Sequence, residues 1–181
     1  MRTTSLKVLG KNVASFFRHH IMSLEYARTV SPSDRLHIER VTDRPGEMIG
    51  ATYSLDAAAR LLRKNKGLCD VFVFLDSDGN KVGTASVMYK GGNDFEYRIR
   101  NVDAFIYNVF TAVEHRGRGY AVDMMKHVMA FLHAKGIDKV YLAVSTNNKP
   151  AIRAYVKAGF IVERDSSFIR VLRVNIPYRK L

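Results

Sequence analysis

The chain has little of what would build a disulfide framework or a membrane anchor. Among its 181 residues there is one cysteine, Cys69, so an intramolecular disulfide and a cysteine-rich metal site are both excluded. The N-terminal residues lack the uninterrupted apolar stretch of a secretory signal, because Lys7, Lys11 and Asn12 interrupt it. The strongest apolar run, residues 71–75, is far too short to span a bilayer. We therefore predict a soluble cytoplasmic protein, which fits a compartment that keeps thiols reduced.

Acidic residues are scarce relative to basic ones. The chain has 29 Lys and Arg against 17 Asp and Glu, a net charge of +12. This excess is spread evenly, because residues 1–68 and residues 69–181 each carry +6. It favours polyanionic partners, among which nucleic acid and a phosphate-bearing cofactor or substrate both remain open. Hydrophobic residues make up 47%, enough for the core of one domain of this length.

Hydrophobic periodicity, caps and turn residues divide the chain into a series of elements. The patterns predict a helix over residues 11–28, a short strand over 35–41, a helix between Ser54 and Gly67, a hairpin over 70–90, a strand over 95–113, a helix to Lys135, a strand over 140–144, a helix between Asn148 and Gly159, and a last hairpin of 160–163 with 168–176. This order predicts a mixed α+β sheet, mostly antiparallel, with one parallel crossover.

Several polar groups that resemble sites are interpreted as structural. Residues 76–80 have turn chemistry, because the glycine of a calcium loop stands later and its distal Glu is missing here. No histidines have metal-ligand spacing, so we predict no metal site. We predict that His19 and His20 lie on a helix surface. A group of basic side chains is interpreted as a solvated face instead of a nucleic-acid stripe: Arg60, Arg63, Lys64 and Lys66.

A glycine-rich turn follows the long strand and opens a helix. It comprises residues 116–121, with the sequence RGRGYA. Helix N-termini leave N–H groups unpaired and carry partial positive charge, and small residues let a phosphate approach them. Arg116 and Arg118 add positive charge. The turn matches neither a Walker A loop nor GxGxxG, so a plain strand–turn–helix junction stays the alternative to a pyrophosphate site.

A second segment, residues 148–160, lies one strand further along the chain. With a right-handed crossover, the two helices begin at the same edge of the sheet. Tyr155, on the second helix, would then point into a gap between two parallel strands. Core packing is the alternative role for Tyr155.

Together the two segments resemble the GNAT superfamily of acyl-CoA-dependent N-acetyltransferases. Residues 116–121 meet the family pattern Gln/Arg-x-x-Gly-x-Gly/Ala, and the second block is met at Asn148, Ala151, Ile152, Tyr155, Lys157, Gly159 and Phe160. The resemblance covers residues 70–176 and implies a GNAT-like sheet, splayed between the two strands that hold acetyl-CoA. It also implies one domain over residues 1–181, with a variable acceptor-side region over 1–69 and the acyl-CoA-binding core over 70–176.

The resemblance implies a role for each matching position. Tyr155 would protonate the departing thiolate, for which a phenol that is protonated at pH 7 is suited. A backbone N–H at a strand bulge, near Val109 or Phe110, would bind the thioester oxygen. The cofactor-binding residues would be Val109, Phe110 and Thr111 along the pantetheine arm, Arg116, Gly117, Arg118, Gly119, Tyr120, Ala121 and Val122 around the pyrophosphate, and Asn148 and Tyr155.

The general base is the least defined part of the predicted site. Asp103 is the first choice because it stands near the start of the strand before the bulge, with Tyr107 and Glu96 as alternatives. For each of these a solvent-facing or structural role competes. Cys69 lies outside both motifs, so we expect it to be buried. GNAT enzymes that acetylate ribosomal-protein N-termini carry a Glu where this chain has Ala143, which argues against that acceptor class.

The resemblance therefore implies an N-acetyltransferase that moves an acetyl group from acetyl-CoA to the amine of a small molecule. A phosphorylated acceptor such as a sugar nucleotide suits the charge of +12. One alternative is a protein or peptide N-acetyltransferase. Another is a non-catalytic module that binds CoA or nucleic acid. We expect neither a membrane nor a nucleic-acid partner for the enzyme, and either a monomer or a homodimer.

Overall fold

A single mixed sheet organises the part of the chain that the computed structural model describes, residues 5–8, 11–25, 31–41, 65, 67–92, 102–171 and 174–177. Its nine strands are β1 (Ser5–Val8), β2 (Lys11–Glu25), β3 (His37–Val41), β4 (Cys69–Leu75), β5 (Lys81–Tyr89), β6 (Ala104–Thr111), β7 (Lys139–Ser145), β8 (Ile161–Val171) and β9 (Val174–Pro177). The spatial order is β3-β4-β5-β6-β7-β2-β8-β9, and β1 pairs with β2. Only β6 and β7 pair in parallel among these strands, which confirms the predicted mixed sheet.

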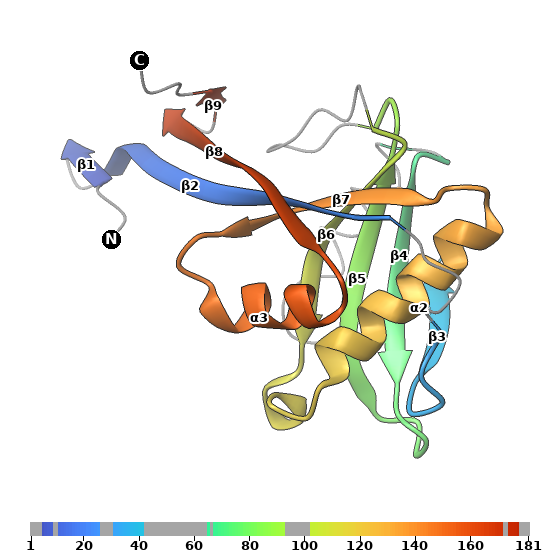
Figure 1. Ribbon diagram of the computed structural model, residues 1–181. Helices are drawn as coiled ribbons and strands as arrows, with labels where there is room; N and C mark the ends of the chain where they lie inside the picture. The colour runs from blue at the N-terminus through green and yellow to red at the C-terminus, as the bar shows by residue number, and fades with distance from the viewer. Residues whose placement is uncertain are drawn as a thin grey trace.

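The predicted hairpin and both later helices are confirmed. The turn between β4 and β5 is closed by Asp76, whose Oδ1 accepts the N–H groups of Asp78 at 3.0 Å and Asn80 at 2.8 Å. Helix α2 (Tyr120–Ala134) connects β6 to β7, and Gly136 follows it with a φ of 76°. Helix α3 (Lys149–Lys157) follows β7, and Asn148 caps it by accepting the Ala151 N–H at 3.3 Å. Both helices lie on the same face of the sheet (Figure 1).

The predicted helix over residues 11–28 is wrong, because residues 11–25 form the strand β2. This strand lies between β7 and β8 and pairs antiparallel with both. Its buried residues Met22 and Leu24 belong to the same apolar cluster as the inner face of α2. His19 and His20 therefore stand on a strand and not on a helix surface. Pairing on both sides satisfies the backbone of β2, and this overrides a weak helical periodicity.

The predicted hairpin of residues 160–163 with 168–176 is also wrong, because no turn separates the two segments and one strand, β8, spans residues 161–171. β8 runs without interruption through Asp165 and Ser166, which pair with His20 and His19 of β2. Asp165 accepts hydrogen bonds from Arg18 at 2.5 Å and contacts His20 Nδ1 at 2.6 Å. The neighbouring strand supplies partners for these polar residues, so they do not need a turn. The hairpin partner of β8 is β9, which pairs with it from residue 168 onward.

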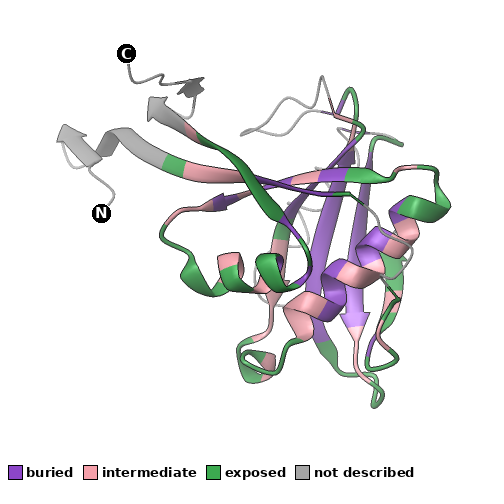
Figure 2. Ribbon diagram, viewed as in Figure 1, coloured by how far each residue is buried: buried purple, intermediate pink, exposed green. Residues whose placement is uncertain are grey.

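The core lies on both faces of the sheet. The larger cluster joins alternate residues of the central strands to α2 and α3, and includes Phe72, Phe74, Met125 and Leu142. Figure 2 shows this burial along the inner side of α2 and the strands behind it. The opposite face carries a smaller cluster that contains Cys69, which is buried as predicted. The predicted helix after Ser54 lies outside the described residues. Neither described helix is long and apolar enough to cross a membrane.

A buried carboxylate ties the C-terminal end of α2 to the sheet. Asp70 of β4 accepts hydrogen bonds from Arg40 Nε at 2.7 Å, from Lys135 Nζ at 3.2 Å and from the Tyr89 hydroxyl. Burial alone would raise the pKa of Asp70, but the hydrogen bonds from Tyr89, Arg40 and Lys135 outweigh it and hold the pKa below its usual value. Because Lys135 directly follows α2, these contacts fix this end of the helix.

Candidate functional site

The two parallel strands separate soon after they meet. β6 and β7 pair only at Phe105 with Tyr141 and at Ile106 with Leu142, within the described part of the chain. Beyond these positions a cavity of about 170 Å³ opens between the strands. The edge of β6 that faces β7 therefore has backbone groups without a strand partner, at the place where the sequence predicted a gap.

A bulge in β6 marks the start of this gap. Along β5 the register passes from Ser86 to Thr84, while along β6 it passes from Tyr107 to Phe110, so β6 has one extra residue. Asn108 stands at the bulge with a φ of 54°. Asparagine adopts this left-handed conformation more readily than most residues. A bulge leaves backbone groups unpaired and redirects the strand, which supports the expectation of a free N–H near Val109.

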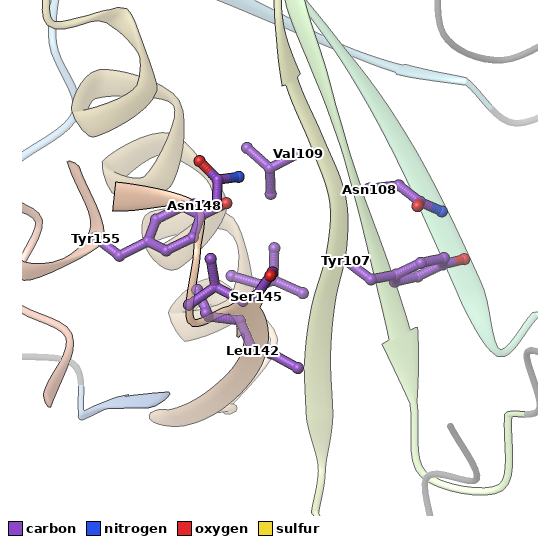
Figure 3. Close-up of a pocket in the computed structure, with 10 residues that line it drawn as sticks. Tyr107, Asn108, Val109, Leu142, Ser145, Asn148 and Tyr155 are labelled. Atoms are coloured by element: carbon purple, nitrogen blue, oxygen red, sulfur yellow. The ribbon is translucent and has the colours of Figure 1, made fainter. Parts of the chain in front are cut away.

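Side chains from both strands and from α3 line the cavity. Its lining includes Val109, Ser145, Asn148 and Tyr155. Figure 3 shows Val109, Asn148 and Tyr155 on the same side of β6, with Tyr107 on the other side of that strand. Sequence reasoning missed Ser145 and Asn108 as lining residues, since neither belongs to a motif. Asn148 reaches this place because it caps α3, directly after β7.

Tyr155 is part of the apolar core and also lines the cavity. The two predicted placements of its side chain, in the core or at the gap between the parallel strands, are therefore both correct. Its side chain is 8% exposed, and its ring lies 6.0 Å from the ring of Phe160. Burial raises the pKa of Tyr155 to about 12, because the phenolate would lose hydration. The hydroxyl is therefore protonated throughout the physiological pH range, so a proton is present at Oη that it can donate.

A short 3-10 helix, η1 (Val113–His115), follows β6. The glycine turn then joins η1 to α2. Gly117 and Gly119 have φ values of 77° and 86°, which favour glycine. The N–H groups of residues 117–121 make no backbone hydrogen bond within the described part of the chain. The Val122 N–H donates to the Gly119 carbonyl at 2.9 Å. The turn thus presents a row of N–H groups without a backbone partner at a helix N-terminus, an arrangement that suits a phosphate.

The two arginines of the turn behave differently. Arg116 folds back onto β6, where its Nε donates to the Thr111 carbonyl at 3.0 Å and its guanidinium lies 5.5 Å from the centre of the Phe110 ring. Arg118 is exposed. His115 packs edge-on against Tyr120, with ring centres 5.7 Å apart. Arg116 and His115 therefore brace the turn, while Arg118 faces solvent.

The predicted bases lie apart from the cavity or point away from it. Asp103 is exposed, stands one residue before β6 and does not line the cavity. Tyr107 belongs to the residues that line the cavity, but its side chain points to the other side of β6 from Tyr155, where its hydroxyl lies 3.1 Å from Cys69 Sγ. Glu96 lies outside the described residues. The role of Asp103 as base stays a prediction.

One contact to the turn had no signal in the sequence. Arg35, in the loop before β3, donates from Nη2 to the Arg118 carbonyl at 3.0 Å. Its Nη1 also lies 3.3 Å from Asp123 Oδ2 in the first turn of α2. These residues are more than 80 positions apart in the chain, so no local pattern could have connected them.

Comparison with known proteins gives consistent results. Residues 34–160 match the model of the acetyltransferase (GNAT) family. A streptothricin acetyltransferase from Streptomyces lavendulae is 34% identical over 49% of this chain and 43% of its own length. A mycothiol acetyltransferase from Corynebacterium aurimucosum is 26% identical over 77% of this chain and 48% of its own length. The chain thus spans about half the length of these curated relatives.

A solved structure shares the fold. The spermidine N-acetyltransferase from Vibrio cholerae, in complex with CoA and spermine, has a TM-score of 0.53 and 19% sequence identity. The match covers 73% of this chain and 84% of that protein. At this identity the likeness concerns the arrangement of strands and helices.

Proposed function

Because the chain belongs to the GNAT acetyltransferase family, we propose that it is an N-acetyltransferase that moves the acetyl group of acetyl-CoA to the primary amine of a small molecule. The observation that carries this proposal is the gap between β6 and β7, with the buried hydroxyl of Tyr155 beside it. The chain leads from this gap along β6 and through the short helix η1 into the glycine turn. A thioester site and an anion site are thus joined by one strand and this short helix.

The residues present fit acetyl-CoA, which when bound supplies the acetyl group as a thioester. The N–H groups of residues 117–121 would hold the pyrophosphate, and Asn148 would contact the cofactor arm. The free edge of β6 over residues 109–111 would pair with the pantetheine arm as a strand would.

The chain's own groups divide the chemistry between them. A free N–H at the Asn108 bulge would stabilise the oxygen that gains charge as the amine attacks. Tyr155 would hold a proton at Oη for the departing thiolate, and its pKa of about 12 keeps that proton in place until then. Asp103 remains our proposed base. It would have to act through water, because it lies outside the cavity.

The acceptor class is supported by the relatives. The two curated relatives are named for streptothricin and mycothiol, which supports a small-molecule acceptor here. The net charge of +12 further supports a phosphorylated acceptor. We also propose that the whole chain acts as one such domain, and that residues 1–69, apart from the core strand β2 and from Arg35 at the glycine turn, serve the acceptor side.

Calorimetric titration with acetyl-CoA, with ATP and NAD as controls, tests the cofactor part of the proposal. We expect selective binding at micromolar concentration. A panel of amines, with phosphorylated and unphosphorylated members and short peptides, then tests the acceptor through release of free CoA. Turnover of peptides alone would replace the proposed acceptor class. Binding without any turnover would favour a non-catalytic module, and no binding would contradict the proposal.

A further inference from the structure

Arg35 holds the glycine turn through three different contacts. Its Nη2 donates to the Arg118 carbonyl at 3.0 Å, and its Nη1 lies 3.3 Å from Asp123 Oδ2. Its guanidinium also lies 4.6 Å from the centre of the Tyr120 ring, within the range of a cation–π contact. One side chain thus touches the backbone of the turn, the first residue of α2 and a carboxylate in its first turn.

The contact with the Arg118 carbonyl fixes the direction of an N–H group. In a planar trans peptide, the carbonyl of one residue and the N–H of the next point in opposite directions. Because the Arg118 carbonyl points to Arg35, the Gly119 N–H points away from Arg35. Gly119 has the left-handed φ of 86° that this geometry uses. Arg35 therefore orients one of the N–H groups assigned to the pyrophosphate.

The contact with Asp123 removes an electrostatic obstacle. Asp123 has a side chain that is 12% exposed, in the first turn of the helix whose N-terminus would receive the phosphate. A carboxylate there interacts well with the helix dipole but repels an incoming anion. Arg35 is the cation that pairs with it among the described residues. Loss of Arg35 would leave a partly buried negative charge beside the anion site.

We propose that Arg35 is a positioning residue that makes the protein select acyl donors carrying the CoA pyrophosphate. It holds the glycine turn in its anion-binding form and neutralises Asp123. This inference rests on the proposed function, since it takes the glycine turn as the pyrophosphate site. It predicts that Arg35 contributes to binding of CoA but not of pantetheine, which lacks the pyrophosphate.

The test measures the Kd of CoA and of pantetheine by calorimetry. The variants are Arg35→Met, Arg35→Lys, Arg35→Met combined with Asp123→Asn, and Arg18→Met. Arg18 is a matched control, because its side chain is also 52% exposed and also pairs with one aspartate, Asp165. Thermal unfolding of each variant shows that it is folded. Arg35→Lys keeps the charge and serves as a second variant if Arg35→Met does not fold.

We expect Arg35→Met to raise the Kd of CoA roughly tenfold, in line with the loss of one charge-assisted hydrogen bond and one ion pair. The Kd of pantetheine should stay unchanged, Arg35→Lys should show an intermediate loss, and Arg18→Met should change neither Kd. Adding Asp123→Asn to Arg35→Met should restore part of the CoA affinity, because the unpaired charge is gone.

Two results would overturn the role of Arg35 while leaving the proposed function intact: an unchanged Kd of CoA in both Arg35 variants, or an equal loss for CoA and pantetheine. If the wild-type protein binds no CoA, the proposed function fails and this inference fails with it.

Discussion

The two halves of the sheet are built differently and give the site different things. The half formed by β3, β4, β5 and β6 with α2 connects its last three strands one after another in the chain. It gives the site mainly backbone groups, at the Asn108 bulge and in the glycine turn. The half formed by β7, β2 and β8 with α3 contains a strand from the N-terminal region. It gives the site the side chains of Asn148 and Tyr155.

This difference indicates which kind of substitution should impair the site in each half of the sheet. A backbone contribution is sensitive to the conformation of the main chain, so glycine substitutions should matter most in the first half. A side-chain contribution depends on the group itself and on the strand that supports it. If the division is real, substitutions in the two halves should affect cofactor binding, the chemical step and stability in different ways.

The largest effect is expected from Tyr155→Phe, which removes the proton donor and keeps the ring against Phe160. We expect kcat to fall about 100-fold or more, as for the loss of a general acid, with little change in the Kd of acetyl-CoA. Steady-state kinetics and titration measure both. Tyr141→Phe, on β7 outside the cavity lining, is the control. An unchanged kcat, with the chemical step shown to be rate-limiting, would remove Tyr155 as the acid.

The next effect tests whether β2 is a full member of the core. Met22 is 0% exposed, and Met22→Ala should lower the free energy of unfolding by about 2–5 kcal/mol. Met129→Ala on α2, also 0% exposed and in the same cluster, should cost a similar amount. Denaturant unfolding measures both. A negligible loss for Met22 beside a full loss for Met129 would mean that β2 is a peripheral strand.

A smaller effect is expected at the glycine turn. Gly119→Ala strains a residue with a φ of 86° and should raise the Kd of CoA by about tenfold, because strain of 1–2 kcal/mol shifts the turn out of its binding form. Gly136→Ala is the matched control at the other end of α2, since Gly136 has a φ of 76° and open space around it. Both variants should lose similar stability. Equal CoA affinity in the two would place the pyrophosphate elsewhere.

The smallest effect is expected from Asp103→Asn, because Asp103 is exposed and outside the cavity. If Asp103 relays a proton through water, kcat/KM should fall by less than about tenfold, mainly on the acidic side of the pH profile, where the amine must lose its proton. Asp138→Asn, in the exposed loop between α2 and β7, is a control. A pH profile identical to that of the wild type would exclude Asp103 as the base.

The sequence alone determined the parts of the protein that neighbouring residues encode. The hairpin closed by Asp76, the cap at Asn148 and the glycines around α2 depend on contacts within a few positions, and all three are confirmed. The same local signals located the gap beside Tyr155 once two segments were read together. Turn and cap energies act over such short distances, so the order of residues carries them.

Only the tertiary structure decided where residues 11–25 lie and what holds the glycine turn. The position of β2 beside β8 depends on contacts such as that between His20 and Asp165, which are 145 positions apart. Arg35 reaches Arg118 across 83 positions, and the bulge at Asn108 exists relative to the register of β5. These features depend on which surfaces meet after the chain has folded, and no periodicity or motif along the chain records that choice.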